Sequence, residues 1–211
     1  MNETDLRAAV VEVGRSLHER GLTPGSSGNV SVRLPSGGWL FTPTGSTLGK
    51  LQADELSVLD DLDRHRSGHP PTKEVPLHLA AYEARPETTA VVHLHSPYAV
   101  ALSVLSGLDA DDVLPPLTAY YVMRVGRLPL VGYLPPGDAG LGKAVAGLLA
   151  RSPCVLLANH GSLAAGTSLD AAVDAVEEIE QTARLWFIVG DRSTRPLTAS
   201  QVASLDDRGR A

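Results

Sequence analysis

Short strand-like segments alternate with helix-length segments along most of this chain, and that alternation limits the possible folds more than any other feature. Residues 29–34 alternate at period two, and a Ser-Gly-Gly turn joins them to residues 39–41, which predicts a β-hairpin. Further β-type runs lie at residues 56–59, 90–95 and 154–158. The last of these is the most apolar, which predicts a central strand.

Helical periodicity occupies the segments between the strand-like runs. Leu6, Val10, Val13 and Leu17 recur at the spacing of an amphipathic helix that stops at Gly21. Further helices are expected at residues 74–84, 97–105, 141–149, 169–189 and 200–204. Helices interleaved with strands predict a layered α/β fold with a mixed sheet. Because no repeat or linker interrupts the chain, residues 1–211 are expected to form a single domain.

Composition excludes several classes of function. The 18 Lys and Arg against 24 Asp and Glu leave a net charge of −6, which provides no electrostatic reason to bind nucleic acid or an anionic membrane. The single cysteine, Cys154, excludes an intrachain disulfide and a cysteine metal cluster. No apolar run approaches the roughly 18 residues of a membrane span, and residues 1–5 are acidic where a signal peptide is basic. We therefore expect a soluble cytoplasmic protein.

Three histidines are the first indication of chemistry. His93 and His95 lie two residues apart in a β-type run, so both imidazoles face one side and can approach one metal ion. His160 follows the apolar run at 154–158, and ligands of α/β proteins gather at strand ends. Each signal has a plain alternative, because strand and turn histidines also pair with backbone carbonyls or water.

Glu74 adds a carboxylate at the start of the predicted helix at 74–84. It can ligate metal or move a proton, or it can simply complement the positive end of the helix. Lys73 beside it can be an ordinary surface charge. His78 follows one turn later and shares the face of Glu74, with a core or surface position as its alternative.

Two loops rich in glycine, serine and threonine lie at residues 25–29 and 42–46. They offer hydroxyls and backbone N–H groups that suit a phosphate, although ordinary turns use the same residues. The chain has no Walker or dinucleotide-binding fingerprint and no serine or cysteine nucleophile motif.

Five segments, in order, carry a family resemblance: residues 28–33, 42–45, 73–74, 93–95 and 159–161. Together they resemble the class II aldolase/adducin-head family over nearly the whole chain. The resemblance implies a three-layer α/β/α sandwich with a central mixed sheet, assembled as a homotetramer with active sites between subunits. It also implies a bound Zn²⁺, or another divalent metal such as Mn²⁺ or Co²⁺.

The resemblance also implies roles for individual residues. The implied metal ligands are Glu74, His93, His95 and His160, and Glu74 is also the implied catalytic acid/base. The implied phosphate-loop positions are Gly28, Asn29, Thr44, Gly45, Thr72 and Lys73. In the aldolases of this family a tyrosine of the neighbouring subunit protonates the leaving group. Here we favour Tyr121 for that role, with the adjacent Tyr120, a substrate-binding candidate, as the second choice.

Lys73 stands where aldolases of the family tend to have a serine. Residues 72–78 and 120–126 look more like the 3-oxo-tetronate 4-phosphate decarboxylase branch. That branch implies loss of CO₂ from a sugar-acid phosphate, through an enediolate, to dihydroxyacetone phosphate. One alternative is a fuculose or rhamnulose phosphate type of aldolase, which releases dihydroxyacetone phosphate and an aldehyde. The other is a catalytically silent adducin-like interaction module, which the complete Glu74 and histidine set argues against.

Overall fold

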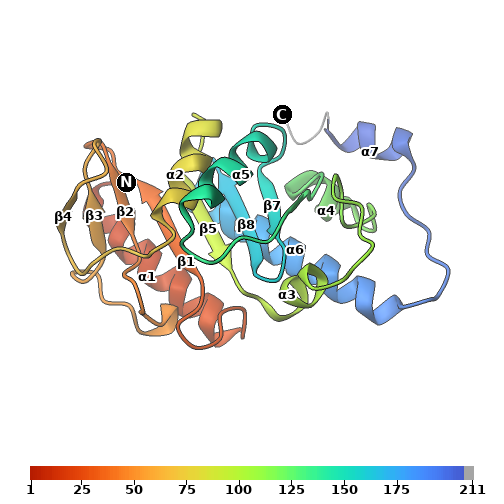
Figure 1. Ribbon diagram of the computed structural model, residues 1–211, viewed down its shortest axis with the longest axis horizontal. Helices are drawn as coiled ribbons and strands as arrows, with labels where there is room; N and C mark the ends of the chain where they lie inside the picture. The colour runs from red at the N-terminus through yellow and green to blue at the C-terminus, as the bar shows by residue number, and fades with distance from the viewer. Residues whose placement is uncertain (207–211) are drawn as a thin grey trace.

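The computed structural model describes residues 1–206. Its strands join into one sheet that runs across most of the molecule. Within these residues the sheet has eight strands in the order β4-β3-β2-β1-β5-β8-β7-β6 (Figure 1). Neighbouring strands are antiparallel except for the parallel pair β6 and β7, so the sheet is mixed. The strands are β1 (Asn29–Arg33), β2 (Trp39–Phe41), β3 (Ser57–Leu59), β4 (His65–Ser67), β5 (Ala90–Leu94), β6 (Leu130–Val131), β7 (Cys154–Leu157) and β8 (Gly161–Gly166). The last residues of the proposed domain, 207–211, lie outside the described part of the chain.

Helices cover both faces of this sheet, which confirms the three-layer α/β/α sandwich (Figure 1). One layer contains α1 (Glu3–Glu19), α3 (Pro97–Ser103) and α6 (Leu169–Val189), whose apolar side chains share a core with the sheet. The opposite layer contains α2 (Val75–Ala84) and α5 (Ala139–Leu149), which share a second core with the other face. The remaining helices are η1 (Leu48–Lys50), α4 (Ala119–Arg124) and α7 (Ala199–Asp206).

Period-two alternation decides which strand residues enter which core. Val30 and Val92 pack in the core beside α1 and α6, whereas Val91 packs in the core beside α2 and α5. The residues paired across β1 and β5 include Asn29 opposite His93. Asn29 and His93 are both buried, so the polar positions of these strands are not exposed to water.

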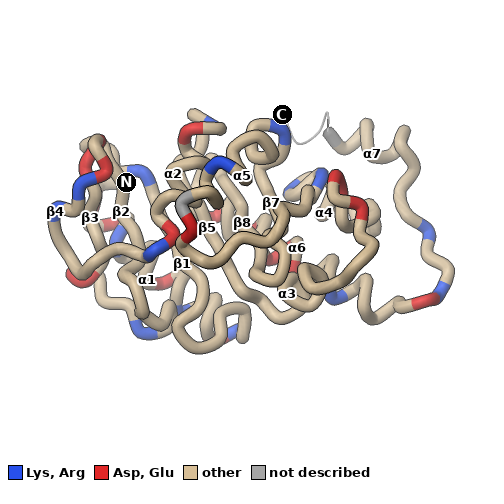
Figure 2. Tube along the Cα trace, in the orientation of Figure 1, with Lys and Arg blue, Asp and Glu red and all other residues tan. Residues whose placement is uncertain are grey.

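Charged residues avoid the middle of the sheet. Strands β5, β7 and β8 contain no Lys, Arg, Asp or Glu, and both signs are interspersed along the rest of the trace (Figure 2). No helix within residues 1–206 is long and apolar enough to cross a membrane.

The structure corrects the predicted position of the apolar run at 154–158. This run forms β7, the second strand from one edge, and β8 lies between it and β5. Strand β8 was not predicted because glycine, alanine and serine have low β propensity. Small residues are required there: a Cβ on Gly161 would lie 2.2 Å from the Leu94 carbonyl oxygen, and one on Gly166 would lie 2.5 Å from the Ala172 nitrogen.

Several other elements agree with the sequence-based expectations. The hairpin of β1 and β2 is antiparallel, as predicted. The helix expected at 169–189 is α6, and the helix expected at 74–84 begins at Val75 with Glu74 as its N-cap. Strands β4 and β6 and helix α4 are too short to produce a clear periodic signal and were not predicted.

Candidate active site

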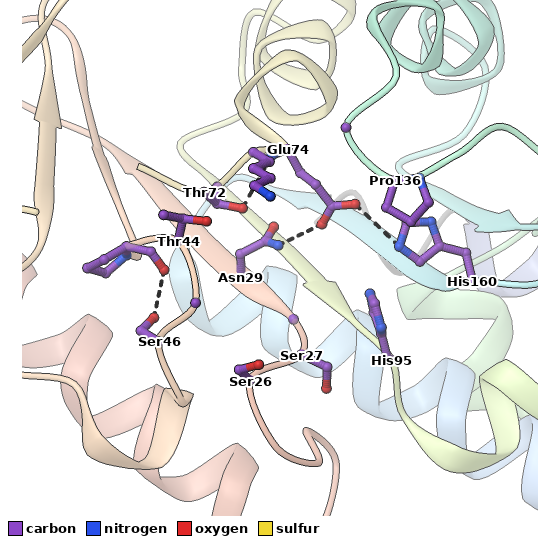
Figure 3. A pocket seen from close by; sticks show the side chains of 15 residues that line it. Ser26, Ser27, Asn29, Thr44, Ser46, Thr72, Glu74, His95, Pro136 and His160 are labelled. Carbon is purple, nitrogen blue, oxygen red and sulfur yellow. Dashed lines mark hydrogen bonds and ion pairs between the residues drawn. The ribbon is translucent and has the colours of Figure 1, made fainter. Parts of the chain in front are cut away.

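Four side chains from three parts of the chain converge at the end of the central strands. Glu74 is the N-cap of α2, His93 lies on β5, His95 follows β5, and His160 lies in the turn between β7 and β8. One potential ligand atom from each residue lies within 4.8 Å of the others. Figure 3 shows Glu74, His95 and His160 pointing toward one another. The structure thus brings together all four predicted ligands.

The distances within this cluster suit a tetrahedral metal ion. His93 Nε2 lies 3.0 Å from His95 Nε2 and 3.4 Å from His160 Nε2. The Glu74 oxygens lie 3.4 Å from His93 Nε2 and 3.3 Å from His160 Nε2. A tetrahedral zinc ion with bonds of about 2.0–2.2 Å needs ligand atoms about 3.3–3.6 Å apart. The four side chains therefore fit a divalent ion with only small adjustments.

The backbone sets the ring orientation of His93. Its Nδ1 lies 2.8 Å from the carbonyl oxygen of Ser162, and a carbonyl can only accept a hydrogen bond. Nδ1 therefore carries the proton, and the lone pair of Nε2 points into the cluster. Metal-bound histidines commonly donate their other N–H in this way.

Burial also favours the protonation states that metal binding requires. Burial lowers the pKa of His93 and lowers the pKa of His95 to about 3, and the neighbouring imidazoles act in the same direction. Burial alone would raise the pKa of Glu74, but its interaction with His93 and the hydrogen bonds from His160 and Asn29 hold that pKa well below its usual range. Neutral imidazoles beside an ionised carboxylate are the forms that bind a metal ion.

A pocket of about 270 Å³ opens beside the cluster and contains every residue predicted for the phosphate loops (Figure 3). Those lining residues are Gly28, Asn29, Thr44, Gly45, Thr72 and Lys73. Gly28 and Gly45 both have positive φ, at 77° and 69°, a conformation that glycine adopts readily. A Cβ on Gly28 would also lie 3.0 Å from the His93 carbonyl oxygen, so the loop approaches β5 closely.

Further residues line the pocket, some from the two predicted loops and some from a segment that the sequence did not indicate. Ser26, Ser27 and Ser46 contribute hydroxyls from the same two loops. Pro136 and Gly137 come from the distant segment before α5, which no local motif connects with the loops. The serines belong to the two loops whose hydroxyls were predicted to suit a phosphate. Only the packing of α5 against α2 brings Pro136 and Gly137 to the pocket.

The two candidate tyrosines differ sharply in exposure. Tyr121 is 0% exposed in the core beside α6, whereas Tyr120 is 62% exposed on α4. The Tyr121 hydroxyl has no hydrogen-bond partner among the described residues, and burial raises its pKa. Neither tyrosine lines the pocket of its own chain. A side chain held in its own core cannot reach a neighbouring subunit, so this geometry favours Tyr120 over Tyr121.

The sandwich thus positions a His₃Glu cluster that could hold a metal ion beside a pocket lined by polar loops. The chain belongs to the class II aldolase and adducin family: the model of the class II aldolase and adducin N-terminal domain matches residues 8–187.

Within the family, the chain is 50% identical over 204 residues to the 3-oxo-tetronate 4-phosphate decarboxylase of Pectobacterium atrosepticum, covering 97% of this chain and 94% of that protein. An L-fuculose phosphate aldolase of Escherichia coli is 31% identical over 189 residues, covering 89% of this chain and 85% of that protein. The crystal structure of YgbL from Klebsiella pneumoniae has a TM-score of 0.94 and 49% identity, covering 97% of this chain and 99% of that one.

Proposed function

We propose that this protein decarboxylates a 3-oxo-tetronate 4-phosphate to dihydroxyacetone phosphate and CO₂ with the help of a divalent metal ion. The observation that carries the proposal is the convergence of Glu74 and three imidazoles at one end of a pocket lined by phosphate-type loops. The higher identity to a named decarboxylase, 50% against 31% for a named aldolase, favours loss of CO₂ over release of an aldehyde.

The proposed reaction breaks one carbon–carbon bond. In a β-keto acid the carboxylate is one carbon away from the ketone, so the electron pair of the broken bond can move toward the ketone oxygen as CO₂ departs. This produces an enediolate, and one proton added to its carbon gives dihydroxyacetone phosphate. A divalent ion held by Glu74, His93, His95 and His160 would act as a Lewis acid that polarises the ketone and stabilises the negative charge.

Zinc is the metal we propose, because three imidazole nitrogens and one carboxylate form a typical tetrahedral zinc site. Mn²⁺ and Co²⁺ are the alternatives. Glu74 is the one carboxylate among the four side chains, so it can release the metal ion and then accept or donate a proton. Asn29 Nδ2 donates to Glu74 Oε2 at 2.7 Å and so holds one of its two oxygens.

The pocket loops are proposed to bind the phosphate, and Lys73 to neutralise the substrate's charge. Gly28, Gly45 and Thr44 line the pocket, and the backbone N–H groups and hydroxyls of such loops suit phosphate oxygens. Lys73 is exposed at the pocket wall and adjacent to Glu74, where an ammonium group can reach a carboxylate or phosphate.

We further propose a homotetramer in which Tyr120 of one subunit protonates the intermediate bound by its neighbour. Support comes from the exposure of Tyr120 and from its absence among the lining residues of its own pocket. A phenol in this position would add the proton that converts the enediolate to product.

Product analysis tests the proposed reaction. The purified protein, loaded with Zn²⁺, is incubated with the erythro and threo forms of 3-oxo-tetronate 4-phosphate and with L-fuculose 1-phosphate. We expect equal amounts of CO₂ and dihydroxyacetone phosphate from one of the four-carbon acids. Faster release of an aldehyde from the ketose phosphate would replace the decarboxylase with the aldolase. No turnover of any substrate by metal-loaded protein would favour the silent interaction module.

A further inference from the structure

A chain of hydrogen-bonded buried polar groups, here called the ladder, leads from the four candidate metal ligands into the layer between α2 and β1. Glu74, His78 and Tyr82 recur every four residues along α2 and so form one stripe. Asn29 and Ser31 lie two apart on β1 and face that stripe. All five residues are at most 8% exposed.

Contacts within the ladder form one continuous chain. Asn29 Nδ2 lies 2.7 Å from Glu74 Oε2, and Asn29 Oδ1 lies 2.5 Å from His78 Nε2. On the other side of the imidazole, His78 Nδ1 lies 2.7 Å from the Ser31 hydroxyl. That hydroxyl in turn lies 2.9 Å from the hydroxyl of Tyr82.

Glu74, at one end of the ladder, determines the direction of every hydrogen bond in it. An ionised Glu74 can only accept, so the NH₂ group of Asn29 must face it and the amide oxygen must face His78. That oxygen also accepts only, so Nε2 of His78 carries a proton. Burial lowers the pKa of His78 to about 3, which leaves its ring neutral and Nδ1 free to accept from Ser31. Burial also raises the pKa of Tyr82, so its hydroxyl keeps its proton and donates to Ser31.

The ladder prevents the Asn29 side-chain amide from adopting its other orientation, with the oxygen and the NH₂ group exchanged. If the amide rotated by half a turn, its oxygen would face the carboxylate and its NH₂ would face the N–H of His78. Two buried pairs would then be mismatched, and each unsatisfied buried group costs about 1–3 kcal/mol. The His78 imidazole neither lines the pocket nor belongs to the candidate ligand set, and it connects to the Glu74 carboxylate through Asn29. The backbone N–H of His78 donates to the backbone carbonyl of Glu74 as part of the first turn of α2.

We propose that His78 is a positioning residue: its Nε2–H holds the Asn29 amide so that Asn29 engages Oε2 of Glu74 and leaves Oε1 available for ligand or proton exchange. Oε1 lies 3.3 Å from His160 Nε2, and Oε2, the oxygen that accepts from Asn29, lies 3.4 Å from His93 Nε2, so both oxygens border the imidazoles and only Oε2 is held by Asn29. The inference rests on the proposed function, because it assigns Glu74 a role in turnover.

Two substitutions of His78 separate its two hydrogen bonds. Glutamine is long enough to place its amide nitrogen near the position of Nε2, so His78→Gln keeps the donor to Asn29. Asparagine reaches only to the position of Nδ1, so His78→Asn keeps a contact with Ser31 and loses the donor to Asn29. Both variants replace a buried imidazole with a buried amide, so each is the matched control for the other.

We expect His78→Asn to lower kcat at least tenfold while KM changes less than threefold, because residue 78 does not line the pocket and the loop glycines and Thr44 stay in place. We expect His78→Gln to restore kcat to within about threefold of the wild-type value. Thermal midpoints and bound metal per chain should be similar in the two variants. Equal loss of kcat in both variants, at equal metal content, would overturn the positioning role.

A second measurement does not depend on activity or on a variant that folds. Nitrogen-15 NMR of the metal-free wild-type protein should show His78 as the neutral tautomer with the proton on Nε2. A proton on Nδ1 would overturn the inference. If the wild-type protein releases no CO₂, the proposed function fails, whereas the tautomer result still decides the arrangement of the ladder.

Discussion

Strands β1 and β5 present an apolar face to one helical layer, whereas their other face carries Asn29, Ser31 and His93 beside Val91. Val30, Val32 and Val92 pack against the layer of α1 and α6. On the opposite face, Ser31 contacts α2 through His78, and His93 contacts Glu74 at the start of the same helix. Residues that are neighbours in the sequence therefore enter environments of opposite character.

The difference shows how one sheet combines stability with chemistry. The apolar face contributes mainly through burial, which does not depend on direction. On the polar face each buried group needs a partner of the correct donor or acceptor type, so its residues determine one another's orientation. Substitutions on the two faces should consequently differ in what they damage.

The strongest test compares neighbouring residues on β5. His93→Ala should remove bound metal and lower turnover by at least about 1,000-fold, because the Lewis acid contributes several kcal/mol to the transition state. Val92→Ala, on the apolar face, should cost about 2 kcal/mol of stability and keep its metal. Metal analysis and thermal unfolding of both variants provide the comparison. Full metal content and activity in His93→Ala would disprove the assigned site.

The second test asks whether the polar site extends across a subunit boundary. Tyr120→Phe should lower kcat about 100-fold with little effect on stability, because the ring is exposed and a proton donor is worth about 10²–10⁴-fold. Mixing inactive Glu74→Gln subunits with Tyr120→Phe subunits should restore part of the activity by forming hybrid sites. Verified mixed oligomers without any recovery would place the whole site in one chain.

Lys73 allows a test at the pocket wall. Lys73→Ser introduces the residue typical of the aldolases, and it should lower decarboxylation more than tenfold, equivalent to about 1.4 kcal/mol. Metal content should stay full, because Lys73 is not among the four ligand residues. Steady-state kinetics together with metal analysis checks both statements. Unchanged turnover would show that Lys73 is only a surface charge.

Substitution of Tyr121, which lies in the apolar core, should have the smallest effect on activity and stability. Tyr121→Phe removes a buried hydroxyl for which the described residues offer no partner. Since an unsatisfied buried polar group costs about 1–3 kcal/mol, the variant should be as stable as the wild type or slightly more stable. Activity should remain within about twofold of wild type. Unfolding midpoints and kcat measure this, and a large loss of activity would return Tyr121 to the catalytic role.

The sequence pattern was sufficient to predict features of the site that depend on residues only a few positions apart. The two-residue spacing of His93 and His95 predicts imidazoles on one side of an extended segment. Their Nε2 atoms lie 3.0 Å apart, although β5 ends at Leu94 and His95 follows it. The same local logic placed Gly28 and Gly45 in loops, and both have positive φ. Periodicity did not indicate that β8 would displace β7 from the centre, because its small residues resemble a loop.

The sequence by itself determined the alternation of helices and strands, the pairing of His93 with His95, and the two polar loops, because each depends on residues close together in the chain. The tertiary structure alone decided that Tyr121 is buried and Tyr120 exposed. It also decided that the polar face of β1 lies under α2 instead of facing water. Burial depends on which distant segments pack over a residue, and a period of two or 3.6 residues identifies a face without identifying what covers it.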